Sequence, residues 1–184
     1  MSYEFREADH EAEFEQIRRL NHRAFADELG QHPPSPDGRL VDDREARSRY
    51  FVALCGERVV GMVCASTTPP FSVESRLPGT AILDSFPQPH CEVRLLAIEP
   101  AHRNTLVISG LLLCLLRAVL EQGAGTLLIS GVAGRVEMYQ RLGFRPLGPP
   151  VPQGQAAFVP MALRLDELPQ LVRRGVARDQ RRTS

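Results

Sequence analysis

Two side chains in the second half of the sequence, Glu92 and Tyr139, can carry acid–base chemistry. Glu92 begins an apolar run, residues 92–98, that predicts a buried strand, and a carboxylate there can take a proton from an amine, directly or through water. Tyr139 falls on a predicted helix, where its hydroxyl can protonate a leaving thiolate. Each has a plainer interpretation: Glu92 as a strand-end carboxylate in solvent or paired with Arg94, and Tyr139 as a half-buried aromatic of the core.

The segment that follows this strand has the residues of a phosphate site. Arg103 can hold a phosphate through two parallel hydrogen bonds, and the free backbone N–H groups at the start of the next helix favour the same ligand. The alternative is that Arg103 is a solvated loop charge. The candidate phosphate ligands are Arg103, Asn104, Thr105, Leu106 and Val107.

The elements that must position these residues alternate between strand and helix. Apolar residues recur at helical spacing from Phe14 to Phe25, which predicts a helix capped by Asp9 and ended by Gly30. Residues 67–90 are rich in proline and predict a long loop that either covers a pocket or buries its apolar side chains in a satellite core. Strands are predicted at 3–8, 50–54, 58–65, 92–98, 126–130, 144–147 and 157–163, and helices at 9–30, 42–49, 104–122, 132–142 and 166–172. This order predicts a mixed α/β fold, with six to seven strands in a central mixed sheet and helices on both faces.

The stretch from Glu92 to Phe144 resembles the GNAT superfamily. The matching pieces are the strand, the turn Glu99-Pro100-Ala101-His102-Arg103, the helix after it, and Met138-Tyr139-Gln140-Arg141-Leu142-Gly143-Phe144. The resemblance extends from about Phe5 to Leu163 and implies a GNAT-like fold that transfers an acyl group from a pantetheine thioester. Strands that splay leave backbone groups unpaired, so a pantetheine arm can pair with them like an added strand. Leu96, Ala97 and Ile98 are the candidates for that pairing.

The turn departs from the family pattern at two positions. Members of the family usually carry small residues there, whereas this chain has Leu106 and Ile108. A large side chain hinders the close approach of a pyrophosphate to the backbone. Either coenzyme A binds in a modified pose, or the donor is the phosphopantetheine of an acyl carrier protein, which has a single phosphate.

A second resemblance bears on the donor. Residues 14–29, residues 143–149 and the segment 158–168 are similar to N-acyl amino acid synthases and acyl-homoserine lactone synthases. Those enzymes have a GNAT fold and take long acyl chains from acyl carrier protein. They typically carry a Glu-x-Ser-Arg strand motif, of which this chain keeps Glu92 but has Arg94 and Leu95 in place of the Ser and the Arg.

Composition limits the remaining possibilities. The 184 residues suit one domain, and 22 basic and 22 acidic side chains cancel, which gives no electrostatic argument for nucleic acid or an anionic membrane. No apolar stretch approaches the roughly 20 residues of a membrane span, and the N-terminus lacks a signal-peptide pattern, so a cytoplasmic location is predicted.

Four widely spaced cysteines predict buried reduced thiols, and no metal is expected. The predicted domain covers residues 1–172, and the basic tail 173–184 is interpreted as disordered or a linker.

The sequence therefore predicts an N-acyltransferase that moves an acyl group from acetyl-CoA, acyl-CoA or acyl carrier protein to a small-molecule amine. Glu92 would deprotonate the amine, backbone N–H groups of the central strand would polarise the carbonyl, and Tyr139 would protonate the thiolate. Two alternatives stay open: a degenerate GNAT-fold domain that binds an acyl thioester or a partner without catalysis, and an accessory domain fused to another enzyme. Arg135, Arg141 and Arg145 can form a basic rim for an acidic carrier protein or be scattered surface charges.

Overall fold

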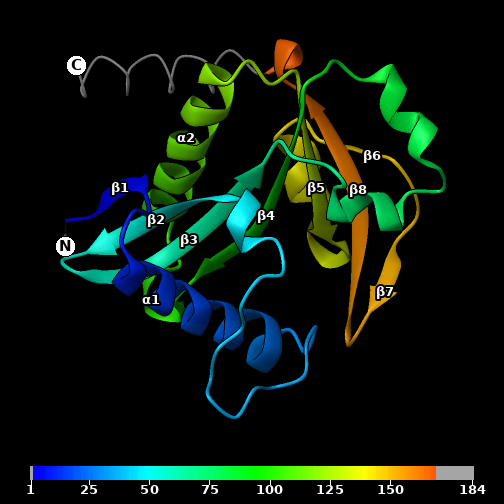
Figure 1. Ribbon diagram of the computed structural model, residues 1–184. Coiled ribbons are helices and arrows are strands. Elements are labelled where there is room, and N and C mark those ends of the chain that lie inside the picture. Colours follow the sequence, from blue (N-terminus) through cyan, green and yellow to red (C-terminus); the bar gives the residue numbers. More distant parts are fainter. Residues whose placement is uncertain (1, 169–184) are drawn as a thin grey trace. The chain divides into compact units, whose positions relative to one another are not determined.

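A computed structural model describes residues 2–168 of the chain (Figure 1). These residues divide into two compact units, the first made of residues 2–65 and 94–115 and the second of residues 66–93 and 116–168. Two elements belong to both units. Strand β4 (His90–Ile98) begins in the second unit and ends in the first, whereas helix α2 (Thr105–Glu121) begins in the first and ends in the second.

The first unit is an antiparallel arrangement of strands between two helices. Its strand order is β1-β2-β3-β4, and β2 and β3 form a hairpin that turns at Gly56, where φ is +62°. Apolar side chains of α1 pack against one face of these strands, where Ile17 and Leu20 share a core with Tyr50. The elements are β1 (Glu4–Glu7), α1 (Glu11–Asn21), β2 (Arg49–Cys55) and β3 (Arg58–Ser66).

The start of α2 covers the other face of the same strands. Gly61 in β3 permits this close packing, because a Cβ at that position would lie 3.1 Å from Leu111 and 3.3 Å from Val107. Both α2 side chains are fully buried. Helices therefore cover both faces of the strands in this unit, as the sequence predicts.

The second unit is built around β5 (Thr126–Val132) and β8 (Ala156–Arg164), which are antiparallel. The first residues of β4 pair in parallel with β5, from His90 opposite Thr126 to Glu92 opposite Leu128. Two short strands, β6 (Arg145–Pro146) and β7 (Val151–Gln153), both pair with β8, and helix α3 spans Val136–Arg141.

Two separate apolar clusters cover opposite faces of these strands. Leu128 belongs to one cluster, together with Phe71 and Val73 from the long segment before β4. Ile129 belongs to the other, together with Tyr139 of α3. Successive strand residues point to opposite faces, so we call the first the loop face and the second the α3 face.

The fold class is as predicted, with eight strands rather than six to seven because β7 was not predicted. The long segment 67–90 contains two 3₁₀ helices, Ser72–Arg76 and Thr80–Ser85. It buries most of its apolar side chains in a satellite core, which was one of its two interpretations, whereas Ile82 stays exposed. The helix predicted at 42–49 is a 3₁₀ turn, Glu45–Arg47. The helix predicted at 132–142 is shorter, because residues 133–135 form a separate 3₁₀ turn before α3.

Two predictions at the N-terminal helix need correction. Asp9 does not cap it: the N-cap is His10, and the Glu13 side chain instead accepts a hydrogen bond from the Asp9 N–H at 3.1 Å. The helix also does not stay α-helical, since His22–Glu28 form a π-helix before Gly30, whose φ of +58° ends it as predicted.

The sequence also predicted a last helix and buried cysteines. The helix predicted at 166–172 is a 3₁₀ turn, Leu165–Glu167, and residues 169–172 and the predicted tail 173–184 lie outside the described residues. Three of the four free cysteines are buried as predicted, whereas Cys55 is half exposed because it lies where β2 enters the hairpin turn. No helix among residues 2–168 is long and apolar enough to cross a membrane.

Candidate active site

Glu92 is a buried carboxylate that holds the segment before β4 in place. Its side chain is 1% exposed. It accepts hydrogen bonds from the Ser72 N–H at 2.9 Å, the Ser72 hydroxyl at 2.6 Å and the Val73 N–H at 2.7 Å. These donors begin the 3₁₀ helix Ser72–Arg76. Glu92 is therefore not a solvated strand-end charge, because its oxygens accept hydrogen bonds from Ser72 and Val73 of the same unit.

Tyr139 packs on the α3 face. A Cβ on Gly131 would lie 2.8 Å from the Tyr139 ring, so the ring occupies the space that this glycine leaves open. The ring also meets Phe144 edge-on, with centroids 6.3 Å apart. Burial raises the pKa of Tyr139, opposed by the charge of Arg135 and a hydrogen bond with the Val132 backbone, so the phenol stays protonated.

The two predicted catalytic residues thus lie on opposite faces of one set of strands. Glu92 is opposite Leu128 in the β4–β5 ladder and shares its loop face. Tyr139 packs over Ile129 and Met161 on the α3 face. The structure places both residues in the second unit but does not bring their side chains together.

The predicted pantetheine segment of β4 contains a backbone irregularity. Leu95 has φ of +55°, the one positive φ of a non-glycine residue among residues 2–168. The left-handed region is disfavoured for a side chain with a Cβ, and such conformations occur preferentially at functional sites. Beyond it, Leu96 is 37% exposed while Ala97 and Ile98 are buried. The strand therefore loses its regular pleat at the segment predicted to bind the donor.

A buried ion pair precedes this irregularity. The Arg94 guanidinium donates to both Asp42 oxygens, at 2.9 and 3.1 Å, and the Tyr50 hydroxyl donates to Asp42 at 2.8 Å. Burial disfavours the charged carboxylate, but the Arg94 charge and these hydrogen bonds outweigh it and hold the pKa of Asp42 below its ordinary value. The pair fixes the segment around Asp42 to β4.

The predicted phosphate ligands follow β4 in the same unit. Arg103 Nε donates to the Ile98 carbonyl at 2.9 Å, which links the turn to the strand end, and its guanidinium also pairs with Glu28 at 2.5 Å. Asn104 Oδ1 accepts the Val107 N–H at 3.1 Å and so caps α2. Leu106 is 61% exposed, so the large side chain at this turn extends into solvent.

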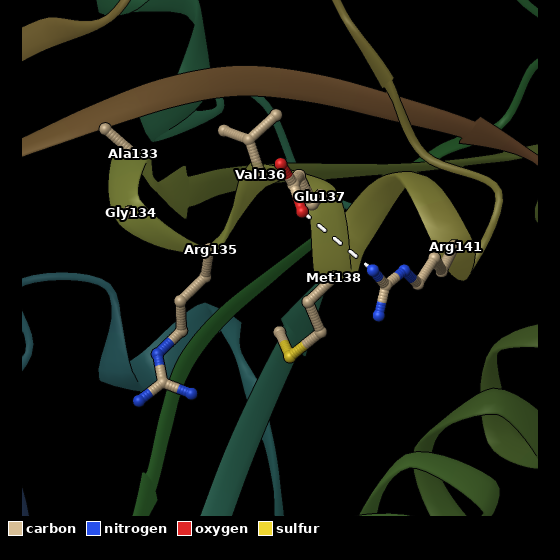
Figure 2. Close-up of a pocket in the computed structure, with 7 residues that line it drawn as sticks. All are labelled: Ala133, Gly134, Arg135, Val136, Glu137, Met138 and Arg141. Carbon is tan, nitrogen blue, oxygen red and sulfur yellow. Dashed lines mark ion pairs between the residues drawn. The ribbon is translucent and has the colours of Figure 1, made fainter.

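A surface depression of about 490 Å³ lies at the start of α3, lined by residues 133–138 and Arg141 (Figure 2). The Arg135 and Met138 side chains extend from the same side of this segment, whereas Arg141 turns toward Glu137, 3.9 Å away. Arg145 pairs with Glu167 at 2.6 Å. Two of the three arginines of the predicted basic rim therefore have carboxylate partners, which weakens the net positive charge there.

Ser72, Arg76 and Asp42 were not predicted as site residues. Ser72 touches Glu92 from 20 positions earlier, and Asp42 touches Arg94 from 52 positions earlier. Arg76 donates to the Ser72 carbonyl and the Ser130 hydroxyl, both at 3.3 Å. Such long-range contacts leave no local spacing pattern, and the proline-rich composition around Ser72 indicated only a loop.

No curated protein sequence matches the chain. Among solved structures, a CoA-dependent acyl-homoserine lactone synthase, BjaI, with SAM and isopentyl-CoA has a TM-score of 0.77 at 22% identity, covering 96% of this chain and 90% of its own. The acyl-homoserine lactone synthase LasI gives 0.70 at 19% identity, covering 93% of each chain. FeeM, an N-acyl amino acid synthase from uncultured soil microbes, gives 0.69 at 18% identity, covering 90% and 92%.

These likenesses show that the chain has the same fold as the two kinds of synthase that its sequence resembles. The family itself is shown by the sequence, since the profile of the acetyltransferase (GNAT) family matches residues 12–144, from α1 through β4 and α2 to Phe144 at the end of the α3 segment. This range includes the irregular strand, the capped turn and both candidate acid–base residues. The chain belongs to the acetyltransferase (GNAT) family of acyltransferase enzymes.

Proposed function

We propose that this protein is an N-acyltransferase that moves an acyl group from a pantetheine thioester to a small-molecule amine. The observation that carries the proposal is the left-handed Leu95 in the middle of β4. A residue in that conformation turns the adjoining peptide groups out of the regular strand alternation, and these groups would then pair with the ligand. Strain of about 1–3 kcal/mol at such a position persists where the surrounding structure maintains it, commonly at a site of function.

The donor would bind along the segment that follows Leu95. Backbone groups of Leu96, Ala97 and Ile98 would pair with the pantetheine arm as an added strand does, and an N–H of this segment would stabilise the oxyanion. Arg103 would hold a phosphate, with the N–H groups of Thr105 and Leu106 at the positive end of α2. The Asn104 side chain already accepts a hydrogen bond from the Val107 N–H, so Asn104 and Val107 would shape the turn rather than bind the phosphate.

Tyr139 and Glu92 would transfer the protons of the reaction. Tyr139, a neutral phenol, would protonate the departing thiolate. Glu92 would accept the proton of the attacking amine. Because Glu92 is buried and already bound by Ser72, it would not reach the amine by itself.

The donor can be acyl-CoA or the phosphopantetheine of acyl carrier protein. The solved structures with this fold include an enzyme bound to isopentyl-CoA and another described as an N-acyl amino acid synthase. The exposed Leu106 favours a donor that contacts an apolar surface near the phosphate, as a carrier protein would. Amine acceptors of the kind named for these structures, SAM and amino acids, are the first to test, and the predicted cytoplasm holds both donors.

The experiment is thiol release with acetyl-CoA, long-chain acyl-CoA and long-chain acyl carrier protein, each with SAM and a mixture of amino acids. Thermal unfolding with each donor alone reports binding separately, because a ligand at 100 times its dissociation constant adds about 2.7 kcal/mol of stability. Turnover with any donor supports the proposal. Binding without turnover across the acceptors, or no binding at all, contradicts it.

A further inference from the structure

We infer that Ser72 relays the proton between the acceptor amine and Glu92. This inference rests on the proposed function and adds a residue to its machinery. Glu92 is 1% exposed, so a substrate in solvent has no access to its oxygens. Ser72 is half-buried and its hydroxyl lies 2.6 Å from Glu92 Oε1. The serine therefore offers a path from this carboxylate toward the surface of the loop face.

Three of the hydrogen-bond donors to Glu92 differ in what they can transfer. The N–H groups of Ser72 and Val73 are amides, which hold the carboxylate but do not give up a proton. The Ser72 hydroxyl can give its proton to Glu92 and take another on its other side, because a hydroxyl is both donor and acceptor. Of these three donors, only the hydroxyl can pass a proton on.

The surroundings of Ser72 hold its backbone in place. Its carbonyl accepts hydrogen bonds from Arg76 Nη1 at 3.3 Å and from the Ser75 hydroxyl at 2.8 Å. The Arg76 guanidinium is itself placed over the Phe158 ring, 5.3 Å from its centroid, and bonds to Ser130 on β5. The backbone of Ser72 is thus held at both ends, by Glu92 and by Arg76, and the short bond to Glu92 is preformed.

The relay moves one proton from the amine to Glu92 through Ser72. The amine nitrogen bonds to the thioester carbonyl carbon, giving a tetrahedral intermediate that carries an N–H proton in excess. That proton passes to Ser72 Oγ while the Ser72 proton passes to Glu92 Oε1, which becomes a carboxylic acid. The C–S bond then breaks and the thiolate takes a proton from Tyr139. Glu92 returns its proton to water through Ser72, and the tyrosinate takes a proton from water, so both residues end in their starting states.

The test compares three variants in single-turnover acyl transfer at saturating donor. Ser72→Ala removes the relay but keeps both hydrogen bonds from backbone N–H groups to Glu92. We expect the chemical step to become about 100-fold slower with the affinity for the donor unchanged, as for loss of acid–base catalysis. Ser72→Thr keeps the hydroxyl and should restore the rate to within about fivefold, since general acid–base catalysis requires the hydroxyl rather than the serine. Ser75→Ala is the matched control, because Ser75 lies in the same 3₁₀ helix and contacts Ser72 but not Glu92.

The solvent deuterium isotope effect separates a relay from a purely structural role. We expect a solvent isotope effect on the chemical step in the wild type and in Ser72→Thr that is reduced in Ser72→Ala. A Ser72→Ala rate equal to that of the wild type would contradict the relay but not the proposed function. Equal losses in Ser72→Ala and Ser72→Thr, with matching losses of thermal stability, would show that Ser72 only holds the loop. Absence of turnover in the wild type would remove the proposed function itself.

Discussion

Glu92 and Tyr139 lie on opposite faces of the same strands: Glu92, in β4, shares the loop face with Leu128, and Tyr139, in α3, packs against Ile129 on the α3 face. Each side chain has its own partners: Ser72 and Val73 for Glu92, and Gly131 and Phe144 for Tyr139. They share no hydrogen bond or apolar cluster in the part of the chain that the structure describes. Their contributions to stability should therefore be independent.

A double-mutant cycle with Glu92→Gln and Tyr139→Phe tests this independence. Glu92→Gln places an amide NH₂ among donors and should lower the free energy of unfolding by about 1–3 kcal/mol. Tyr139→Phe should cost about 1 kcal/mol or less, since only the hydroxyl is lost. The two losses should add to within about 0.5 kcal/mol in urea unfolding. A coupling above about 1 kcal/mol would mean that the residues communicate through a contact not seen here.

Gly131→Ala tests the packing of Tyr139. The new Cβ would lie 2.8 Å from the ring and 3.3 Å from Met161 Sδ, so the ring must move. Overpacking of this kind costs about 1–3 kcal/mol. In a Tyr139→Leu background the cost should shrink, because the ring that it displaces is gone. Gly134→Ala is the control, as a Cβ there meets nothing within 4 Å; an equal loss in both alanine variants would contradict the packing argument.

The sequence predicted the parts of this protein that depend on local pattern. Alternating and helical periods located the β2–β3 hairpin, β4 and α2, and the Tyr139 to Phe144 signature indicated the family. The left-handed conformation of Leu95 could not be predicted, because leucine disfavours it and only the surrounding packing can impose it. The partners of Glu92 were missed for a related reason: a 3₁₀ helix of five residues inside a proline-rich segment has no periodicity to detect.

Leu95→Val should reveal the strain in β4. A β-branched side chain is still less compatible with φ of +55° than leucine is. We expect the free energy of unfolding to fall by about 2 kcal/mol or more, from lost packing plus added strain. Leu96→Val is the matched control: it makes the same change one residue later, where the side chain is 37% exposed, and should cost less than about 1 kcal/mol. Equal losses at both positions would show that the backbone at Leu95 contributes no strain.

Asp42→Asn tests the buried pair with Arg94 through its dependence on pH. The side chains are 3% and 16% exposed, so removing the carboxylate leaves a poorly solvated guanidinium and should cost about 3 kcal/mol at pH 7. Because the folded pKa of Asp42 lies below the unfolded value near 3.9, the stabilisation is complete above about pH 5 and is lost as the pH falls through the folded value.

The wild type and Asp42→Asn should therefore differ by a constant amount in urea unfolding from pH 7 to about pH 5, and converge below about pH 4. Asp9→Asn is the control, because Asp9 is 65% exposed in its pair with Arg6 and should cost less than about 1 kcal/mol at every pH. A difference between wild type and Asp42→Asn that stays constant down to pH 3 would show that the lost stability comes from shape or hydrogen bonding rather than from the charge of Asp42.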